Sequence, residues 1–307
     1  MQLTVRTIGV PGTGPEDVLV APDGSSVLTG TKDGALWSLT PDGSKLARVA
    51  HTAGRPLGLE WLPDGRVLVC DAHRGLLAVD LADGAVEELV TSVDGVRLRF
   101  TNNAAVAADG TIFFSDSSRH YSVDDWKSDL IAHTRTGRLF RRTPDGEVAT
   151  LLDGLAFANG VALTPDGDQV WVAETALSRI RRLSIEGQDL GMIEGLPGYP
   201  DNIALGSDGL IWVAVASPPD ATLGLLQNKG ARLRPLALRL PEAVKPKPKR
   251  TIRAVAYAAD GRLVHDLSAD AGEWHMATGV REHQGELWLG SLVEPAVAVV
   301  TLHGSAR

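Results

Sequence analysis

The hydrophobic residues of this chain alternate with polar ones in short runs, and a glycine-containing dipeptide interrupts many of them. The pattern occurs as VLVAPDGSSVLTG, GLEWLPDGRVLVC, AVAADGTIFFS, VALTPDGDQVWVA and IALGSDGLIWVAV, and with Gln-Gly as VREHQGELWLGSL. A period of two is typical of β-strands, and Asp-Gly favours a tight hairpin because glycine adopts positive φ without steric strain. The sequence therefore predicts six hairpins.

These hairpins recur at a nearly constant interval. Their aspartates at positions 23, 64, 109, 166 and 208 are 41, 45, 57 and 42 residues apart. A period of about 40 to 45 residues is that of a four-stranded blade of a β-propeller. Further Asp-Gly pairs predict the outer hairpin of four blades, at Asp33, Asp83, Asp145 and Asp260. We therefore expect an all-β fold, a six-bladed β-propeller that forms one domain over residues 1–307.

A propeller must close its ring, and residues 2–10 (QLTVRTIGV) have the pattern of an outer strand for the last blade. Two repeat units are longer than the others. In residues 115–137, Ser122 and Asp125 have capping-box spacing before the apolar pair Trp126 and Leu130, which predicts a short helix. Residues 217–250 are rich in Leu and Arg. Because long connections are often lids, we expect both insertions to cover one face of the ring.

The overall charge disfavours some partners. The 307 residues have a formal net charge of −8 and a pI near 5.5, which argues against nucleic acid or an anionic membrane as the main partner. The basic cluster KPKPKR at 245–250 contains alternating prolines and predicts an extended, solvated loop.

No signal peptide or spanning helix is apparent, so we expect a cytoplasmic protein. Cys70 is the single cysteine, which excludes an intrachain disulfide, and we expect it to be buried.

Polar residues precede four of the hairpins at one register. Glu16, Asn102, Asn159 and Asp201 each lie seven residues before the aspartate of the hairpin. Equal offsets in repeated units place these side chains at one height around the central channel. Their carboxylate and amide oxygens suit a hard cation, calcium before magnesium. The alternative is that Asn and Asp at strand starts accept hydrogen bonds from loop backbone.

The residue after three of these positions is also polar, namely Asp17, Asn103 and Asn202. We expect these side chains to add metal ligands or to hold the ring from behind. The predicted metal ligand set is Glu16, Asn102, Asn159, Asp201 and Asn202.

Several motifs together resemble the superfamily of senescence marker protein/gluconolactonase, paraoxonase and strictosidine synthase-like propellers. They are GPEDVLV (14–20), RFTNNAAVAADGTIFFSDSS (99–118), the block from TGRLF to SIEG (136–187), LPGYPDNIALGSDGLIWVAV (196–215) and VREHQGELWLGSL (280–292). The block 136–187 is similar to the strictosidine synthase-like branch that includes the adipocyte plasma membrane-associated protein. We expect this chain to lack that protein's membrane anchor. The resemblance implies a calcium ion at the channel mouth, bound by the residues that match the family motifs.

Two departures from the family pattern change the expected chemistry. Asn103 stands where the family usually has an aspartate that helps to hold a second calcium, so we expect one metal. The catalytic glutamate of the plant synthase lies four residues before its EHDG motif, and the corresponding residue here is Thr278. Glu273 is the nearest carboxylate in the sequence. The resemblance therefore does not imply the amine–aldehyde condensation of that synthase.

The function expected from these residues is calcium-dependent hydrolysis of a lactone or a simple ester. A metal at the ring would polarise the carbonyl, and Asp201 would orient or deprotonate the attacking water. His120 is the alternative base, with His133 and His275 as further candidates. Zn²⁺, Mn²⁺ or Mg²⁺ are alternatives to calcium. The rival functions are a non-catalytic propeller that binds a small molecule or a protein, and a metal-free synthase. The partner we expect is a small molecule, and the sequence sets no oligomeric state.

Overall fold

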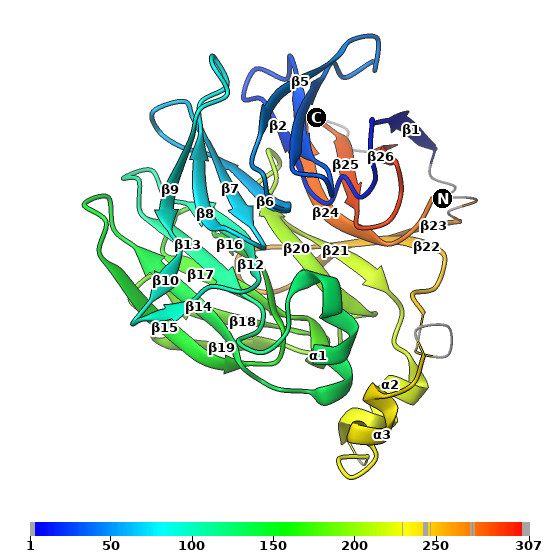
Figure 1. Cartoon of the computed structure of the whole chain (residues 1–307). Helices are drawn as coiled ribbons and strands as arrows, with labels where there is room; N and C mark the ends of the chain where they lie inside the picture. The colour runs from blue at the N-terminus through cyan, green and yellow to red at the C-terminus, as the bar shows by residue number, and fades with distance from the viewer. Residues whose placement is uncertain are drawn as a thin grey trace.

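Six four-stranded antiparallel sheets are arranged as blades around a central channel (Figure 1). The computed structural model describes residues 4–228, 230–241, 245, 247–270, 272 and 274–302. The first strand of each blade contacts the first strands of the neighbouring blades, so these six strands line the channel. The six-bladed propeller expected from the sequence repeat is confirmed.

The first three blades follow one another along the chain. Blade 1 consists of β2 (Val18–Val20), β3 (Val27–Gly30), β4 (Ala35–Leu39) and β5 (Leu46–His51). Blade 2 consists of β6 (Pro56–Trp61), β7 (Val67–Asp71), β8 (Gly75–Val79) and β9 (Val86–Val90). Blade 3 consists of β12 (Thr101–Val106), β13 (Ile112–Asp116), β14 (Gly137–Arg142) and β15 (Val148–Leu155). A small hairpin of β10 (Ser92–Val93) and β11 (Val96–Arg97) connects blades 2 and 3.

The remaining blades complete the ring. Blade 4 consists of β16 (Ala158–Leu163), β17 (Gln169–Glu174), β18 (Arg179–Ser184) and β19 (Asp189–Ile193). Blade 5 consists of β20 (Tyr199–Leu205), β21 (Ile211–Ser217), β22 (Thr251–Tyr257) and β23 (Leu263–Asp270). Blade 6 consists of β24 (Ala277–His283), β25 (Glu286–Ser291), β26 (Ala296–Thr301) and β1 (Val5–Gly9).

The N-terminal strand closes the ring, as expected. β1 pairs antiparallel with β26, from Val5 opposite Val300 to Gly9 opposite Ala296, and it is the outer strand of blade 6. Ile8 and Val10 are buried in the cluster that joins blades 6 and 1. Residues 2 and 3 of the expected strand lie outside the described residues.

The Asp-Gly pairs lie at the turns between strands. Gly24 has a φ of 70°, and the carboxylate of Asp23 accepts a hydrogen bond from the backbone N–H of Ser25 at 3.0 Å. This short polar loop explains why Asp precedes Gly. One prediction was wrong: Asp33 and Gly34 lie in the middle hairpin of blade 1, between β3 and β4. The outer hairpin of that blade contains Asp42 instead, because the β3–β4 connection is itself a tight turn.

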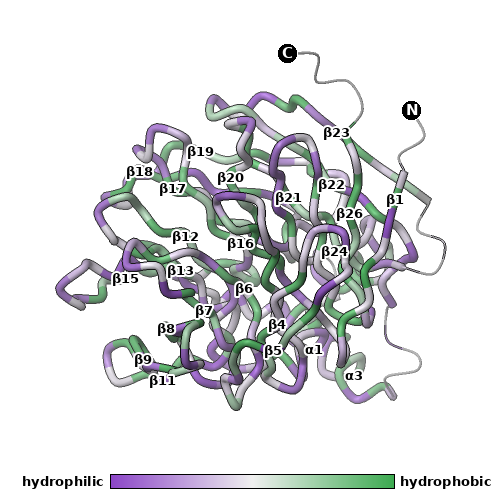
Figure 2. The backbone as a smooth tube through the Cα atoms, turned by 90° about the horizontal axis from the view of Figure 1, so that it is seen from above, coloured by the Kyte–Doolittle hydropathy of each residue, from purple (hydrophilic) through white to green (hydrophobic). Residues whose placement is uncertain are grey.

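The core consists of apolar side chains packed between adjacent blades. Trp171, Trp212 and Trp288 each lie on the second strand of a blade and are fully or almost fully buried. Cys70 is also fully buried on β7, as expected. Figure 2 shows hydrophobic segments concentrated in the strands, with hydrophilic residues at many of the turns.

The two long insertions form short helices. The first contains a 3₁₀ turn, η1 (Val123–Asp125), and α1 (Trp126–Ala132), which confirms the predicted helix. The capping box does not form, because the Ser122 side chain makes no capping hydrogen bond. The second insertion contains α2 (Ala221–Asn228) and α3 (Arg234–Leu238), and both pack against α1. A further 3₁₀ turn, η2 (Thr175–Leu177), follows β17.

None of the helices in the described part of the chain is long and apolar enough to span a bilayer.

Candidate metal centre

The ring residues lie where the inner strands lose their regular pairing. Strand pairing shifts between Thr101 and Ala104, between Ala158 and Val161, and between Pro200 and Ile203. In blade 1 the strand β2 begins at Val18, directly after the polar pair. A bulge leaves residues out of the ladder and redirects their side chains. Each ring residue is therefore available to the channel rather than to the sheet.

The structure brings the four offset-matched residues together in one cavity. Glu16, Asn102, Asn159 and Asp201 all line it. The remaining two blades contribute Leu57 and Thr278 to the same lining. Sequence reasoning did not assign these two positions to the ring. Leu57 also lies seven residues before its hairpin aspartate, whereas the hairpin after Thr278 is shorter and hides the register.

Three amide groups at this site are oriented by their nitrogen atoms. The Nδ2 atom of Asn102 donates to Ser117 Oγ at 2.9 Å, and that of Asn159 donates to Thr175 Oγ1 at 3.1 Å. The Nδ2 atom of Asn202 lies 3.3 Å from both carboxylate oxygens of Glu16. Their Oδ1 atoms are buried and have no hydrogen-bond partner within the described chain. Buried carbonyl oxygens without a donor are uncommon in native proteins and favour a ligand at this position.

The carboxylates of the site are electrostatically unfavourable as they stand. Burial, together with repulsion from Asp201 and Asp17, raises the pKa of Glu16 well above its ordinary value, although Arg55 opposes this. Burial raises the pKa of Asp201 to about 7, against a hydrogen bond from Asn159. Burial also raises the pKa of Asp17 to about 6, against the charge of Arg281. A cation would relieve this crowding of negative charge.

The donor set fits a hard divalent cation. Glu16, Asn102, Asn159 and Asp201 line one cavity and carry carboxylate and amide oxygens, which calcium binds in flexible geometry. Over the described residues, no three His, Cys, Asp or Glu side chains gather into a metal site, so amide oxygens would have to complete the shell. Softer metals that prefer imidazole or thiolate have no such ligand in this cavity lining.

The residues behind the ring connect blades instead of facing the cavity. Asp17 accepts a hydrogen bond from the N–H of Leu59 in the next blade at 2.9 Å, and Asn103 accepts one from Val161 at 2.8 Å. Asn202 does not line the cavity, and its contact is with Glu16. The alternate blades have glycine at the equivalent position: a Cβ on Gly58 would lie 2.7 Å from the Asn103 backbone. Polar side chain and glycine thus alternate around the ring.

An apolar chamber covers the ring. Its empty space is about 850 Å³, a figure that includes open solvent at its mouth. Its walls come from the loops before the inner strands (Phe100, Phe157), from α1 (Trp126, Leu130, Ile131), from α2 (Leu223) and from blade 6 (Met276). Most of these side chains belong to one hydrophobic cluster. Both insertions contribute residues to this wall, and we call their helices α1, α2 and α3 the lid.

The proposed histidine bases lie away from the ring. His120 is exposed and does not line the cavity, and its backbone N–H donates to Ser118 Oγ at 3.1 Å. Burial, then Arg135 and Arg234, lower the pKa of His133 to about 4. His275 contacts the carboxylate of Glu294. No histidine is among the described residues of the cavity lining, so Asp201 is the base candidate that lies at the ring.

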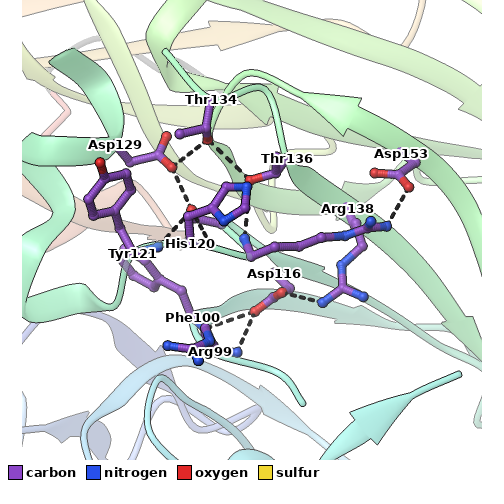
Figure 3. A network of polar contacts seen from close by, with 12 residues as sticks. Arg99, Phe100, Asp116, His120, Tyr121, Asp129, Thr134, Thr136, Arg138 and Asp153 are labelled. Carbon is purple, nitrogen blue, oxygen red and sulfur yellow. Dashed lines mark hydrogen bonds and ion pairs between the residues drawn. The ribbon is translucent and has the colours of Figure 1, made fainter. Parts of the chain in front are cut away.

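A polar network fixes the base of the first insertion (Figure 3). Asp116, at the end of β13, accepts hydrogen bonds from the Phe100 N–H at 2.8 Å and from Arg138 at 2.6 Å. The buried Asp129 of α1 accepts hydrogen bonds from Ser118 and from Thr134. These bonds hold Phe100 and α1 in place on the cavity wall.

The residue that replaces the synthase glutamate has a structural partner. Thr278 Oγ1 donates to the backbone oxygen of Glu16 at 2.8 Å, so it connects blade 6 to the ring. Glu273 lies outside the described residues. Of the side chains described along the cavity, Glu16, Asp201 and Asp220 are the carboxylates.

Comparison with known proteins gives the family. A model described as "SMP-30/Gluconolactonase/LRE-like region" matches residues 28–238, and one described as "Strictosidine synthase-like, N-terminal" matches residues 1–39. Protein STRICTOSIDINE SYNTHASE-LIKE 10 of Arabidopsis thaliana is 33% identical over 97% of this chain and 88% of its own. Adipocyte plasma membrane-associated protein of Gallus gallus is 34% identical over 94% of this chain and 75% of its own.

Solved structures share the fold at lower identity. A gluconolactonase from Xanthomonas campestris superposes with a TM-score of 0.70 at 18% identity, covering 98% of this chain and 90% of that one. Regucalcin of Agrobacterium tumefaciens, described as a calcium-binding protein, superposes with a TM-score of 0.68 at 14% identity, covering 100% and 96%. The chain belongs to the SMP-30/gluconolactonase/LRE-like family, and its curated relatives are strictosidine synthase-like and adipocyte plasma membrane-associated proteins.

Proposed function

We propose that the protein is a divalent-cation-dependent hydrolase. Its substrates would be lactones or simple esters that carry largely apolar substituents. The observation that carries the proposal is the set of unpartnered amide oxygens beside the carboxylates of the buried Glu16 and the partly buried Asp201, at the floor of an apolar chamber. The gluconolactonase and the calcium-binding regucalcin among the structural neighbours support the reaction class and the metal.

The chamber supports a substrate with hydrocarbon or aromatic character. Apart from the polar ring residues, much of the lining is apolar, with side chains such as Leu57, Phe157 and Met276. A polyhydroxylated sugar lactone would leave its hydroxyl groups without partners there, which is costly when they are buried. Charged side chains lie at the lid, where Lys127, Lys247 and Asp220 border the chamber.

The ring residues would divide the work between them. Glu16, Asn102, Asn159 and Asp201 would hold the cation, calcium by preference, and Asn202 would keep Glu16 in position from behind. The cation, when bound, supplies Lewis-acid stabilisation of the negative charge that develops on the carbonyl oxygen. Asp201 faces the chamber, and its carboxylate oxygen would accept a hydrogen bond from the attacking water and orient it. The lid would exclude other water.

A binding protein without catalysis is the second candidate. The observation that favours it is the cavity lining, whose described residues include no histidine and whose Thr175 and Thr278 hydroxyls already donate to backbone oxygens. Such a protein would use the same ring and chamber to bind a small apolar molecule.

One turnover experiment tests the proposal. Phenyl acetate, alkyl-substituted γ- and δ-lactones and gluconolactone are offered to chelator-treated protein, before and after addition of Ca²⁺, Mg²⁺, Mn²⁺ or Zn²⁺. We expect metal-restored hydrolysis that is faster for the alkyl lactones than for gluconolactone and is lost in Asp201→Ala. Metal and ligand binding without turnover would favour the binding protein. Turnover that is indifferent to chelator and to Asp201→Ala would contradict the proposal.

A further inference from the structure

The second insertion has an exposed apolar surface that the core and the cavity do not use. Leu225 on α2 is 56% exposed, and Leu233 (56%), Leu236 (64%) and Leu240 (44%) on and beside α3 are exposed as well. We call these four residues the leucine patch. Leucine is normally among the more buried residue types. Four such exposed leucines within 16 residues differ from the singly scattered apolar residues of an ordinary surface.

The inner side of the same helices explains why the patch faces outward. Leu223 and Ala237 are buried against α1 and the chamber wall. Gln227 donates to the Leu130 backbone oxygen at 3.0 Å, and Arg234 donates to the backbone oxygens of Leu226 and Ala132 at 3.0 and 3.3 Å. These bonds fix α2 and α3 on α1, so the leucine patch cannot rotate into the core.

The charge around the patch is opposite to that of the whole chain. Residues 221–250 contain eight Lys or Arg and one Glu, a net charge of +7, whereas the chain as a whole has −8. Arg232, Arg239, Lys247 and Lys249 are exposed. A negative chain with one basic, apolar projection concentrates its attraction for anions at that projection.

We propose that the leucine patch and its basic border dock the protein on the surface of an anionic phospholipid bilayer. The leucines would enter the interface between head groups and acyl chains, and the Lys and Arg side chains would contact the phosphates. Figure 1 shows α2 and α3 projecting from the propeller body, a shape that suits insertion into an interface. Because Leu223 of α2 also lines the chamber, the docked lid would lie beside its mouth. The proposal is independent of hydrolysis, and it revises the expectation, drawn from net charge alone, that no membrane is a partner.

Vesicle flotation tests the proposal on the full chain. Wild type is mixed with vesicles of phosphatidylcholine alone or of phosphatidylcholine with phosphatidylserine, at low and high salt. We expect binding to the mixed vesicles that weakens with salt. The pair Leu225→Ser/Leu236→Ser should lower the partition coefficient roughly tenfold or more, and Arg232→Gln/Arg239→Gln roughly fivefold per charge. Thermal unfolding of each variant verifies that it is folded.

A matched control separates this patch from general surface hydrophobicity. Leu190 on β19 and Leu263 on β23 are 43% and 49% exposed, and they lie on the outer strands of blades 4 and 5, outside the second insertion. The pair Leu190→Ser/Leu263→Ser should bind vesicles as wild type does. Failure of wild type to float with the mixed vesicles, or an equal loss in the control pair, would overturn the proposal. Self-association that the Leu225→Ser/Leu236→Ser pair abolishes, without vesicle binding, would assign the patch to a second copy of the chain and would also overturn it.

Discussion

Replacement of Thr175 by valine tests how the ring amides are held. Thr175 is 5% exposed, accepts a hydrogen bond from Asn159 Nδ2 at 3.1 Å and donates one to the backbone oxygen of Pro200 at 2.7 Å. Valine has nearly the same shape but neither hydrogen-bonding capacity. The Asn159 amide would then keep only its contact with Asp201, so its oxygen would be held less firmly towards the ring.

The expected magnitude follows from these two bonds. Loss of a group that orients a metal ligand lowers metal affinity by about 10- to 100-fold, which is about 1.4 to 2.7 kcal/mol. The buried Pro200 oxygen also loses its donor, which should lower the free energy of unfolding by about 1–2 kcal/mol. The loss of metal affinity should therefore be larger than a small decrease in the free energy of unfolding alone would cause.

The assay is calcium binding by competition with a fluorescent chelator, with urea unfolding measured on the same samples. Thr175→Ser is the matched control, because it retains the hydroxyl and should keep an affinity within a few-fold of wild type. Wild-type affinity in Thr175→Val, or an equal loss in Thr175→Ser, would refute the idea that this hydroxyl orients Asn159.

Three further predictions concern the lid, the ring backbone and the closure. His133 has a folded-state pKa of about 4, below its ordinary value, so its contribution to stability is present above pH 6.5 and is lost as the pH falls towards 4. After allowance for its partial exposure we expect a loss of about 1 kcal/mol in urea unfolding, and His133→Asn should reduce it. Gly160→Ala should lower the melting temperature, because its Cβ would lie 2.2 Å from the Ile203 nitrogen; Gly224→Ala, with nothing within 4 Å, is the control and should be neutral or slightly stabilising. Deletion of residues 1–10 removes β1 and the burial of two apolar side chains, so urea unfolding should show a loss of about 3–5 kcal/mol and native-like stability would contradict ring closure by β1.

The repeat determines how much of the fold the sequence reveals. Period-two runs joined by Asp-Gly depend on local backbone chemistry, so the six hairpins could be predicted from single segments of the chain. The closing strand could also be predicted, since a propeller needs one. The position of Asp33 could not, because an Asp-Gly turn fits the middle and the outer hairpin equally well, and only the spacing of Asp42 distinguishes them.

The repeat also predicts part of the candidate site. The offset of seven to Glu16, Asn102 and Asn159 reports a shared height on homologous strands, and the structure places all three in one cavity. Leu57 was overlooked because it is apolar, although it has the same offset. The direction of each side chain at a bulge depends on contacts between blades, and no single repeat encodes those contacts.

The lid illustrates what a sequence pattern does not provide. The location of His120 near an insertion says nothing of its distance from the ring, which depends on how α1 packs. The structure turns His120 to solvent and directs Trp126 and Leu130 into the chamber. Net charge was similarly uninformative, because the basic character of residues 221–250 is averaged out over the whole chain.

The most direct test of the central claim is a calorimetric titration of calcium into chelator-treated protein, with lactone hydrolysis followed on the same samples. Wild type, Asn159→Ala and the control Asn228→Ala are compared, since Asn228 is exposed on α2 and does not line the cavity. The account predicts about one ion bound per chain in wild type and in the control, no binding in Asn159→Ala, and hydrolysis that follows occupancy. Absence of calcium binding in wild type, or equal binding in Asn159→Ala, would contradict the metal ring.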